Sequence, residues 1–315
     1  SDIGWVVGHS YNTYAPLIYG CTSILFEGKP IGTPDAGVFW RVIAEHQVKV
    51  LFTAPTAFRA IKRADPEASF LKQHDTSCLK YLFLAGERAD PDTISWAEKK
   101  LGVPVIDHWW QTETGWSICA NPVGVEKLPI KLGSPSVAMP GFNIEVLDDN
   151  GVCLPAGELG AIAIKLPMPP SCLTTIWGAD QICNEKYYSK FLGYYESGDA
   201  GYRDEDGYFY IMARTDDVIN VAGHRLSTGQ LEEVLSDHPD IAECAVIGVA
   251  DQLKGQLPLG LICLYPRSNK APDDIIFEAI DLVRSRVGRI AALNQILESF
   301  FSRTLPNTVA FSATQ

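Results

Sequence analysis

The sequence predicts an α/β protein in which a large domain with layered sheets precedes a small α+β domain. Three short apolar runs alternate with helical stretches, and this order favours a parallel sheet covered by helices. From about Gly141 the pattern changes to closely spaced strands, which indicates a small β-rich subdomain. After Asp216 a helix, two strands and a second helix follow, which is typical of a separate compact unit.

The three apolar runs cover residues 48–52, 79–84 and 103–106, and each ends in a polar segment. After the first run, Thr53 or Thr56 would cap a helix that continues through Lys62. Ligands gather at the carboxyl ends of the strands in parallel sheets. The polar segments that follow these runs are therefore the first places to look for binding residues.

The later elements follow from the same patterns. Strands are expected at residues 143–149 and 160–165, and Asp206-Gly207 is a strong signal for a hairpin turn. In the last third we expect a helix at 227–238, strands at 244–249 and 260–265, and a helix at 272–287. The predicted boundaries are 1–215 for the large domain, 216–290 for a small mobile domain and 291–315 for a divergent tail.

Composition excludes several classes of protein. Of the 315 residues 46% are hydrophobic and 20% are charged, which are ordinary values for a globular chain. The net charge is −12 and no basic run occurs, so a nucleic-acid partner is not expected. No apolar run is long enough to span a membrane. The eight Cys stand singly and the six His lack metal-ligand spacing, which indicates reduced thiols inside the cell and no zinc site.

The densest cluster of functional side chains lies at residues 107–115, directly after the third apolar run. Its carboxylates and hydroxyls can hold a phosphate ester and magnesium, and a Trp can form the wall of an apolar pocket. The alternative is an ordinary turn with buried Trp. Asp199 can accept hydrogen bonds from two ribose hydroxyls, or it is simply a turn Asp. Arg214 and Arg225 flank a short strand and either bind phosphate or belong to a solvated charged turn.

Six segments in order carry a resemblance to a known family. They are residues 1–11 (SDIGWVVGHSY), 53–57 (TAPTA), 85–88 (AGER), 109–115 (WWQTETG), 197–199 (SGD) and 213–217 (ARTDD). Together they resemble the AMP-forming acyl-CoA synthetases, in particular the acetyl/propionyl-CoA synthetase branch, over about residues 1–290. The resemblance implies part of an adenylate-forming domain followed by a small mobile domain. It implies an enzyme that joins a short-chain carboxylate to ATP and then to CoA.

The resemblance also implies a role for individual residues. Thr112, Glu113 and Arg214 would be catalytic, with Glu113 holding Mg²⁺, and Asp216 would be the hinge. The acyl pocket would be formed by Trp5, Val7 and Trp110, and the segment 5–9 (WVVGH) resembles that of the propionate-preferring members. Ala57, Ala222, Gly223 and Arg225 would serve CoA binding and thioester formation. The nucleotide would contact Gly86, Glu87, Arg88, Asp107, Trp109, Gln111, Thr112, Asp199 and Arg214.

Two departures from the family pattern bear on activity. The phosphate loop of the family would lie upstream of residue 1, and Ser312 falls where the family has a catalytic Lys. A lost cation at the reacting phosphate weakens catalysis strongly, so we expect this chain to be impaired or inactive in forming the adenylate. We also expect the tail after residue 290 to be poorly packed.

Two further interpretations remain open from the sequence. One is a non-catalytic protein that keeps a nucleotide or CoA pocket, and the other is an interaction module that only reuses the fold. The expected partners are the small molecules ATP, CoA and a short-chain carboxylate, in the mitochondrial matrix or the cytoplasm. The sequence assigns no oligomeric state.

Overall fold

The computed structural model describes residues 4–87, 89–222, 224–265, 268, 270–288, 291 and 295–298. The chain divides into two compact units, residues 1–215 and 216–315, and each is described by itself. In the described part of the chain, no helix combines the length and the apolar character that a membrane span requires.

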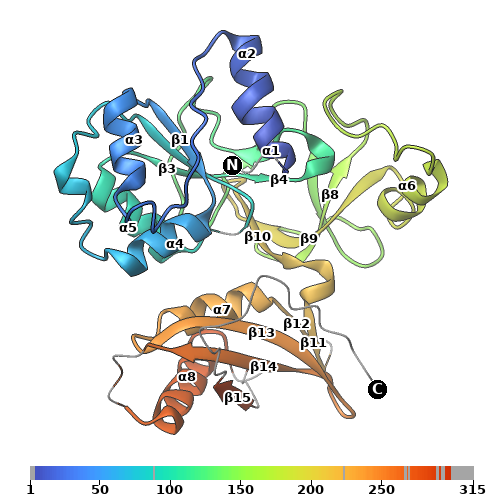
Figure 1. The fold of residues 1–315 in the computed structure, drawn as a ribbon. Helices are drawn as coiled ribbons and strands as arrows, with labels where there is room; N and C mark the ends of the chain where they lie inside the picture. Colours follow the sequence, from blue (N-terminus) through green and yellow to red (C-terminus); the bar gives the residue numbers. More distant parts are fainter. Residues whose placement is uncertain are drawn as a thin grey trace. The chain divides into compact units, whose positions relative to one another are not determined.

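The first unit is built on a three-stranded parallel sheet in the order β1-β2-β3 (Figure 1). Val50 pairs with Tyr81, and Leu82 pairs with Val105, so all three strands run in the same direction. The parallel arrangement predicted from the apolar runs is confirmed, although each strand begins two residues later than its run. The strands are β1 (Val50–Thr53), β2 (Tyr81–Leu84) and β3 (Val105–Asp107).

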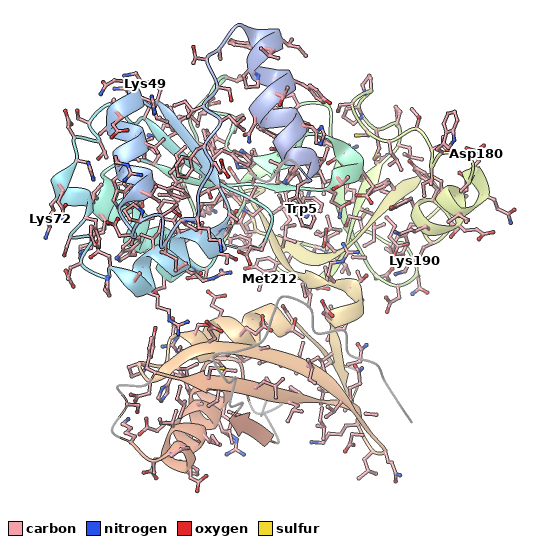
Figure 2. The ribbon with its side chains drawn as sticks, in the orientation of Figure 1. Trp5, Lys49, Lys72, Asp180, Lys190 and Met212 are labelled. Atoms are coloured by element: carbon pink, nitrogen blue, oxygen red, sulfur yellow. The ribbon has the colours of Figure 1, made fainter. Side chains whose placement is uncertain are left out.

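Three helices share one core with this sheet. Trp40, Phe58 and Ile94 come from different helices and are almost completely buried in the same cluster as Leu82 and Leu84. Since side chains alternate along a strand, Leu82 and Leu84 place this core on one face of the sheet. Lys49 and Lys72 are exposed and point away from the unit (Figure 2). The helices are α3 (Val38–His46), α4 (Pro55–Ala64) and α5 (Pro91–Leu101), and a short 3₁₀ turn η2 covers Leu71–Gln73.

The predicted cap of α4 is wrong. The N-cap residue is Ala54, and no side chain accepts a hydrogen bond there. Thr53 is the last residue of β1, and Thr56 lies inside the helix, where its backbone N–H and its hydroxyl both donate to Glu87. The carboxylate of Glu87, from the loop after β2, therefore provides the acceptor that was expected from a threonine.

The site-bearing segment continues from β3 into a second sheet, in the order β4-β5-β6, with antiparallel pairing. Trp109 pairs with Cys119, and Cys119 pairs with Ala138. A 3₁₀ turn connects the first two strands and ends at Gly115, whose φ of 64° is in the left-handed region that glycine adopts easily. The elements are β4 (Trp109–Trp110), η3 (Thr112–Thr114), β5 (Ser117–Ala120) and β6 (Val137–Ala138).

The β-rich subdomain is a four-stranded antiparallel sheet in the order β10-β9-β8-β7. The hairpin predicted at Asp206-Gly207 is confirmed, because residues 204–208 join β9 to β10. Asp180 and Lys190 are exposed at the periphery of this region (Figure 2). Its elements are β7 (Ile144–Leu147), β8 (Gly160–Lys165), α6 (Asp180–Tyr187), β9 (Tyr194–Arg203) and β10 (Phe209–Arg214).

The start of the described chain is helical, and a 3₁₀ turn leads from the first unit into the second. Pro16 lies in α2, which continues without a break from the π-helical turn η1, and its ring nitrogen donates no hydrogen bond to the preceding turn. Gly20 ends that helix in the left-handed conformation. These elements are α1 (Val6–His9), the π-helical turn η1 (Ser10–Tyr14), α2 (Ala15–Tyr19) and the turn η4 (Thr215–Asp217).

The second unit is an α+β fold with a five-stranded sheet in the order β12-β11-β14-β13, and β15 pairs in parallel with β14. Leu231 and Leu235 from one helix and Ile275 and Val283 from the other are buried in its core. The strand predicted at 244–249 extends beyond that range at both ends, and the strand predicted at 260–265 begins earlier than predicted. The elements are β11 (Ile219–Val221), β12 (His224–Leu226), α7 (Thr228–Ser236), β13 (Ile241–Asp251), β14 (Gly255–Leu264), α8 (Pro272–Arg286) and β15 (Gln295–Glu298).

Candidate functional site

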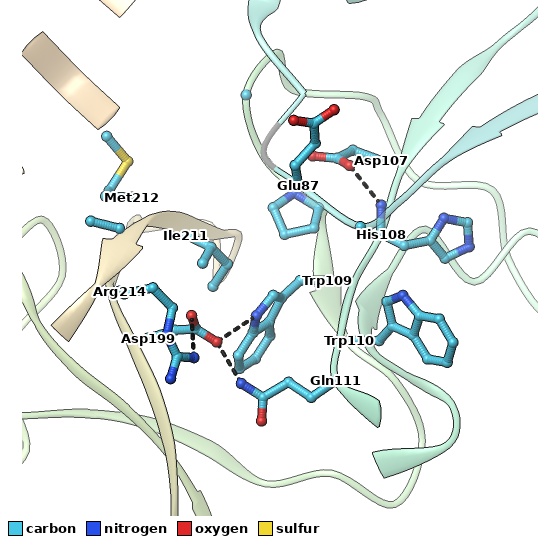
Figure 3. A pocket seen from close by; sticks show the side chains of 14 residues that line it. Glu87, Asp107, His108, Trp109, Trp110, Gln111, Asp199, Ile211, Met212 and Arg214 are labelled. Carbon is cyan, nitrogen blue, oxygen red and sulfur yellow. Dashed lines mark hydrogen bonds and ion pairs between the residues drawn. The ribbon is translucent and has the colours of Figure 1, made fainter. Parts of the chain in front are cut away.

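A cavity of about 360 Å³ lies within the first unit, between the end of the parallel sheet and the β9–β10 hairpin (Figure 3). Its walls come from four separate stretches of the chain, near residues 86, 107–111, 133–135 and 199–214. The size is within the range of small-molecule sites. It brings together many of the residues singled out in the sequence: Gly86, Glu87, Asp107, Trp109, Trp110, Gln111, Asp199 and Arg214.

The carboxylate of Asp199 accepts hydrogen bonds from three side chains at the cavity (Figure 3). Its Oδ2 accepts from the indole Nε1 of Trp109 at 3.0 Å and from the amide Nε2 of Gln111 at 2.7 Å. Its Oδ1 accepts from Nη1 of Arg214 at 3.1 Å. These three donors leave about one of the roughly four lone-pair sites of the carboxylate free, so a second hydroxyl donor would have to take the place of one of them.

The environment of Asp199 acts on its ionisation in both directions. The residue is 7% exposed, and burial raises the pKa of its carboxyl because the charged form loses water. The charge of Arg214 and the hydrogen bonds from Trp109, Arg214 and Gln111 lower the same pKa. Burial has the larger effect, so the pKa of Asp199 lies above its ordinary value and the donors offset only part of the rise.

The strand register places Asp199 and Arg214 together. They are direct cross-strand partners of β9 and β10, so backbone pairing sets their separation. Nη1 of Arg214 also donates to the carbonyl oxygen of Ser197 at 3.0 Å. Gly198 lies between Ser197 and Asp199 in the chain. Its φ is 70°, and a Cβ at this position would overlap with the guanidinium of Arg214 as it is placed here. The glycine of the Ser-Gly-Asp segment is therefore required by both conformation and space.

Gln111 connects this carboxylate to the turn after β4. Its Nε2 donates to Asp199 and also to the carbonyl oxygen of Ser197 at 2.6 Å, while its Oε1 accepts from the hydroxyl of Tyr195 at 2.8 Å. Its backbone N–H donates to Oγ1 of Thr114, which holds the turn. Both ends of the amide are therefore in use.

Thr112 and Glu113 do not line the cavity, although they belong to the adjoining turn η3. Thr112 is exposed, and Glu113 is half-buried with its Oε1 accepting from the hydroxyl of Tyr187 at 2.7 Å. Burial and the nearby Glu113 carboxylate raise the pKa of Tyr187, so this hydroxyl keeps its proton and remains a donor. The turn thus presents one carboxylate and one hydroxyl beside the cavity.

Glu87 lines the cavity, but its carboxylate is already engaged by α4. Oε1 accepts from the backbone N–H of Thr56 at 2.6 Å and from its hydroxyl, and Oε2 accepts from Nη2 of Arg59 at 2.7 Å. Arg59 also reaches Asp90 at 3.4 Å. The charged end of Glu87 therefore ties the loop after β2 to the helix, and its stem and backbone remain to contact a ligand.

Asp107 and His108 follow β3 and have different roles. Asp107 is buried and accepts from the backbone N–H of His108 at 2.9 Å. The His108 ring packs against Phe52 and Phe83, and burial lowers its pKa to about 4, opposed by a hydrogen bond to the carbonyl oxygen of Leu84. The ring is therefore neutral at pH 7, with Nδ1–H as the donor to Leu84.

Trp110 contributes to an aromatic group beside the cavity. Tyr11 makes an edge contact with Trp110 at 5.5 Å and stacks on Phe52 at 4.7 Å and on Trp116 at 5.6 Å. Burial raises the pKa of Tyr11, whose hydroxyl lies 3.3 Å from Oγ of Ser117. These four rings form an apolar surface that a short hydrocarbon group can contact.

The remaining predicted residues lie elsewhere. Trp5 is 67% exposed, and neither it nor Val7 of α1 lines the cavity; the same segment reaches Trp110 through Tyr11 instead. Ala57 is on α4, next to Thr56, which donates to Glu87. Arg88 and Gly223 lie outside the described residues, as do Ser312 and most of the tail. Asp216, Ala222 and Arg225 belong to the second unit, whose placement relative to the cavity is not determined.

Sequence reasoning did not identify several residues of the site. Ile211 and Met212 come from the strand that ends at Arg214, so the hairpin signal combined with strand alternation points to them. Gly133 and Pro135 come from a loop without any distinctive pattern. Tyr195 and Tyr187 were recognisable only as aromatic residues near Asp199. The cavity residues that were missed are His108, Gly133, Pro135, Ile211, Met212 and Ala213.

Comparison with known proteins agrees with these features. The family model of the AMP-binding enzymes matches residues 1–169, and the model of the AMP-binding enzyme C-terminal domain matches residues 230–311. The chain therefore belongs to the AMP-binding enzyme family. The resemblance seen in the motifs of the sequence is confirmed.

Within that family the relatives are short-chain acyl-CoA synthetases. The chain is 48% identical over 310 residues to the mitochondrial acyl-CoA synthetase short-chain family member 3 of Mus musculus, covering 98% of this chain and 45% of the relative. It is 47% identical over 276 residues to a propionate–CoA ligase of Escherichia coli, covering 87% and 43%. The chain thus spans about half the length of the curated relatives it matches.

A solved structure supports the same fold. An anthranilate CoA ligase in complex with anthranoyl-AMP is 25% identical to this chain, with a TM-score of 0.78. The match covers 96% of this chain and 55% of that structure. The predicted fold class, a partial adenylate-forming domain with a small α+β domain, is confirmed.

Proposed function

We propose that this chain carries the acyl-adenylate site of an AMP-forming short-chain carboxylate–CoA ligase. The observation that supports this most directly is that one cavity is lined both by Asp199 and by Trp110, which belongs to the aromatic group described above. An acyl adenylate has a ribose with two hydroxyls, a phosphate and an apolar acyl group. The cavity offers a carboxylate acceptor for the first and an apolar surface for the last.

The nucleotide would bind along the Asp199 side. The carboxylate accepts the two ribose hydroxyls, and Arg214 remains close enough to interact with the ribose and the phosphate. The adenine would lie against Gly86, Glu87, Asp107 and Trp109, and Arg88 would extend this contact. Gln111 and Thr112 would contact the nucleotide at the turn, with Thr112 near the α-phosphate.

The acyl group would lie at Trp110. An indole fills the space that a longer chain needs, so we expect propionate or acetate as the substrate, with propionate preferred. Trp5 and Val7 would lie near this group as part of the segment whose Tyr11 contacts Trp110, although they do not line the cavity. Since one methylene in a pocket is worth about 1–3 kcal/mol, the preference is partial.

The proposed reaction has two steps. The carboxylate oxygen bonds to the α-phosphorus of ATP and pyrophosphate leaves; then the CoA sulfur bonds to the acyl carbon and AMP leaves. Mg²⁺ would offset the charge of the phosphates, and Glu113, whose carboxylate lies at the turn η3 beside the cavity, would hold it, since Mg²⁺ in such sites takes one or two carboxylates and substrate oxygens. Asp216 would serve as the hinge, and Ala57, Ala222, Gly223 and Arg225 would serve the thioester step.

The match covers less than half of these relatives, so the reaction of a whole ligase also involves parts of the relatives that this chain does not match. We propose that residues 1–215 supply the adenylate cavity and residues 216–290 the small mobile domain, with the divergent tail after them. We also propose that the enzyme works inside the cell, in the mitochondrial matrix or the cytoplasm, and the word mitochondrial in the name of one relative supports this.

The ribose assignment is tested by the binding of AMP and of 2′,3′-dideoxy-AMP, measured by equilibrium dialysis. Wild-type protein should bind AMP more tightly, because only AMP offers hydroxyls to Asp199. Asp199→Asn should weaken AMP binding by about 10-fold or more, since hydrogen bonds to a charged group are worth about 1.5–3 kcal/mol. It should bind the dideoxy compound as the wild type does.

Asp75→Asn is the control. Asp75 belongs to the same unit, is exposed, and accepts from the backbone N–H of Ser77 without lining the cavity. This variant should bind both nucleotides as the wild type does. Equal affinity of the wild-type protein for AMP and the dideoxy compound would contradict the assignment.

A further inference from the structure

Gln111 can hold Asp199 in place only if its amide group faces one way. In the observed orientation Nε2 donates to Oδ2 of Asp199 at 2.7 Å and to the carbonyl oxygen of Ser197 at 2.6 Å. If the amide turned over, its oxygen would face a carboxylate oxygen and a carbonyl oxygen at the same distances. Three acceptors would then meet without a proton between them, which is unfavourable in a buried site.

The hydroxyl of Tyr195 selects the observed orientation. It donates to Oε1 of Gln111 at 2.8 Å, so the amide oxygen is held on the side away from Asp199. The side chain of Tyr195 is completely buried, and its ring stacks on Tyr187 at 5.4 Å with an interplanar angle of 13°. The ring therefore has little freedom to move.

The stack reaches the other end of the turn as well. Tyr187 donates to Glu113, two residues beyond Gln111, so two stacked tyrosines contact both polar side chains of the segment 111–113. Burial raises the pKa of Tyr195, which keeps its hydroxyl proton available for donation to Gln111. This arrangement comes from β9 and α6, outside the cavity-lining residues.

We propose that Tyr195 is a positioning residue that acts on the nucleotide site through Gln111. It orients the Gln111 amide so that this side chain donates to Asp199, and Asp199 is thereby held as the acceptor for a ribose diol. The inference rests on the proposed function, because it takes a nucleotide as the ligand. Tyr195 itself does not contact the ligand.

The test is Tyr195→Phe, which keeps the ring and removes only the hydroxyl. AMP binding should weaken by about 3- to 10-fold, the typical effect of losing one buried hydrogen bond. Binding of 2′,3′-dideoxy-AMP should not change, because that ligand does not use Asp199. In a Gln111→Ala background, Tyr195→Phe should have no further effect on AMP binding.

Tyr188→Phe is the matched control. Tyr188 packs against Tyr195 edge to face at 5.9 Å. In the described part of the chain the hydroxyls that donate to Glu113 and to the side chain of Gln111 are those of Tyr187 and Tyr195, not that of Tyr188. This variant should bind both nucleotides as the wild type does. The unfolding midpoint of each variant, measured by circular dichroism, shows that the fold is retained.

A second measurement needs no ligand. The side-chain amide protons of Gln111, observed by NMR with ¹⁵N-labelled glutamine and assigned with Gln111→Glu, should shift in Tyr195→Phe and not in Tyr188→Phe. Unchanged AMP binding in Tyr195→Phe, or an equal loss for both nucleotides, would overturn the positioning role. A wild-type protein that does not distinguish the two nucleotides would instead contradict the proposed function, and the role of Tyr195 with it.

Discussion

His108 shows how burial changes the chemistry of a single residue. Its ring lies between Phe52 and Phe83 and donates to the carbonyl oxygen of Leu84, beside a cavity that is otherwise rich in charged groups. Burial lowers its pKa from 6.5 to about 4. A histidine in such a position holds the end of β3 against β2, and it does not act as an acid or base at neutral pH.

The lowered pKa of His108 makes folding stability depend on pH. Between pH 6.5 and about 4 the unfolded chain binds a proton at His108 that the folded chain does not bind. The free energy of unfolding should therefore fall as the pH decreases through this window, by up to about 3 kcal/mol from this residue. In His108→Gln, urea unfolding measured across the same pH range should show a smaller decrease.

His46→Gln serves as the comparison, because His46 is exposed at the end of α3. It should keep the pH dependence of the wild type. A His108→Gln variant with an unchanged pH dependence would show that folding does not lower the pKa of His108.

At the scale of elements, one loop and one hairpin depend on each other. Lys131 pairs with Asp204 and Asp206 at 2.6 Å and lies over the ring of Tyr208. The hydroxyl of Ser134 donates to the carbonyl oxygen of Phe209 at 2.6 Å. The loop that supplies Gly133 and Pro135 to the cavity is thus fixed to the β9–β10 hairpin, which supplies Asp199 and Arg214.

Ser136 is a strained position in this loop. Its φ is 76°, in the left-handed region, and its buried Oγ has no hydrogen-bond partner within the part of the chain that the structure describes. Ser136→Gly removes both costs, and we expect a gain of about 1 kcal/mol after the extra entropy of the unfolded glycine. The melting temperature should rise by about 2–4 °C.

Ser134→Gly is the control for this prediction. Ser134 has no left-handed backbone, and its hydroxyl holds Phe209. Its loss should lower the melting temperature. The interpretation of Ser136 as strained would be wrong if Ser136→Gly melted below the wild type.

The sequence predicted elements well where one local pattern decided the outcome. β8 has the predicted bounds, and Asp206-Gly207 forms the hairpin turn, because alternation and turn chemistry are local. The cap of α4 was wrong because Glu87, 31 residues from Thr56, provides the acceptor. The positive φ of Ser136 was not predictable either, since serine is an ordinary residue for a loop.

For the site, the residue types were predictable and the contacts between them were not. Asp199 followed from the Ser-Gly-Asp segment, but its donors Trp109 and Gln111 lie about ninety residues earlier in the chain. The hydrogen bond from Tyr195 to Gln111 joins β9 to the turn after β4, and no local pattern in the sequence indicates it. These contacts depend on how distant segments pair, as the register of β9 and β10 does for Asp199 and Arg214. A single sequence does not show that pairing.

At the scale of the whole molecule, the cavity is a product of the complete first unit. The parallel sheet, the turn after β4, the loop fixed by Lys131 and the β9–β10 hairpin each provide one wall. The second unit has its own core around Leu231 and Ile275. Ligand binding in the cavity can therefore be measured as a property of the first unit, whatever the position of the second.

The central claim, a site for a short-chain acyl adenylate, is tested most directly with unreactive esters of AMP. The propyl ester should bind more tightly than AMP by about 10-fold, because its chain is buried against Trp110. The octyl ester should gain nothing over AMP in the wild type, and it should gain affinity in Trp110→Gly but not in a control variant at the exposed Trp177, Trp177→Gly. The affinities of the three ligands are measured by isothermal titration calorimetry of residues 1–315. The site for a short-chain acyl adenylate predicts the highest affinity for the propyl ester, with AMP and the octyl ester weaker. An octyl ester that binds the wild type more tightly than the propyl ester would contradict it.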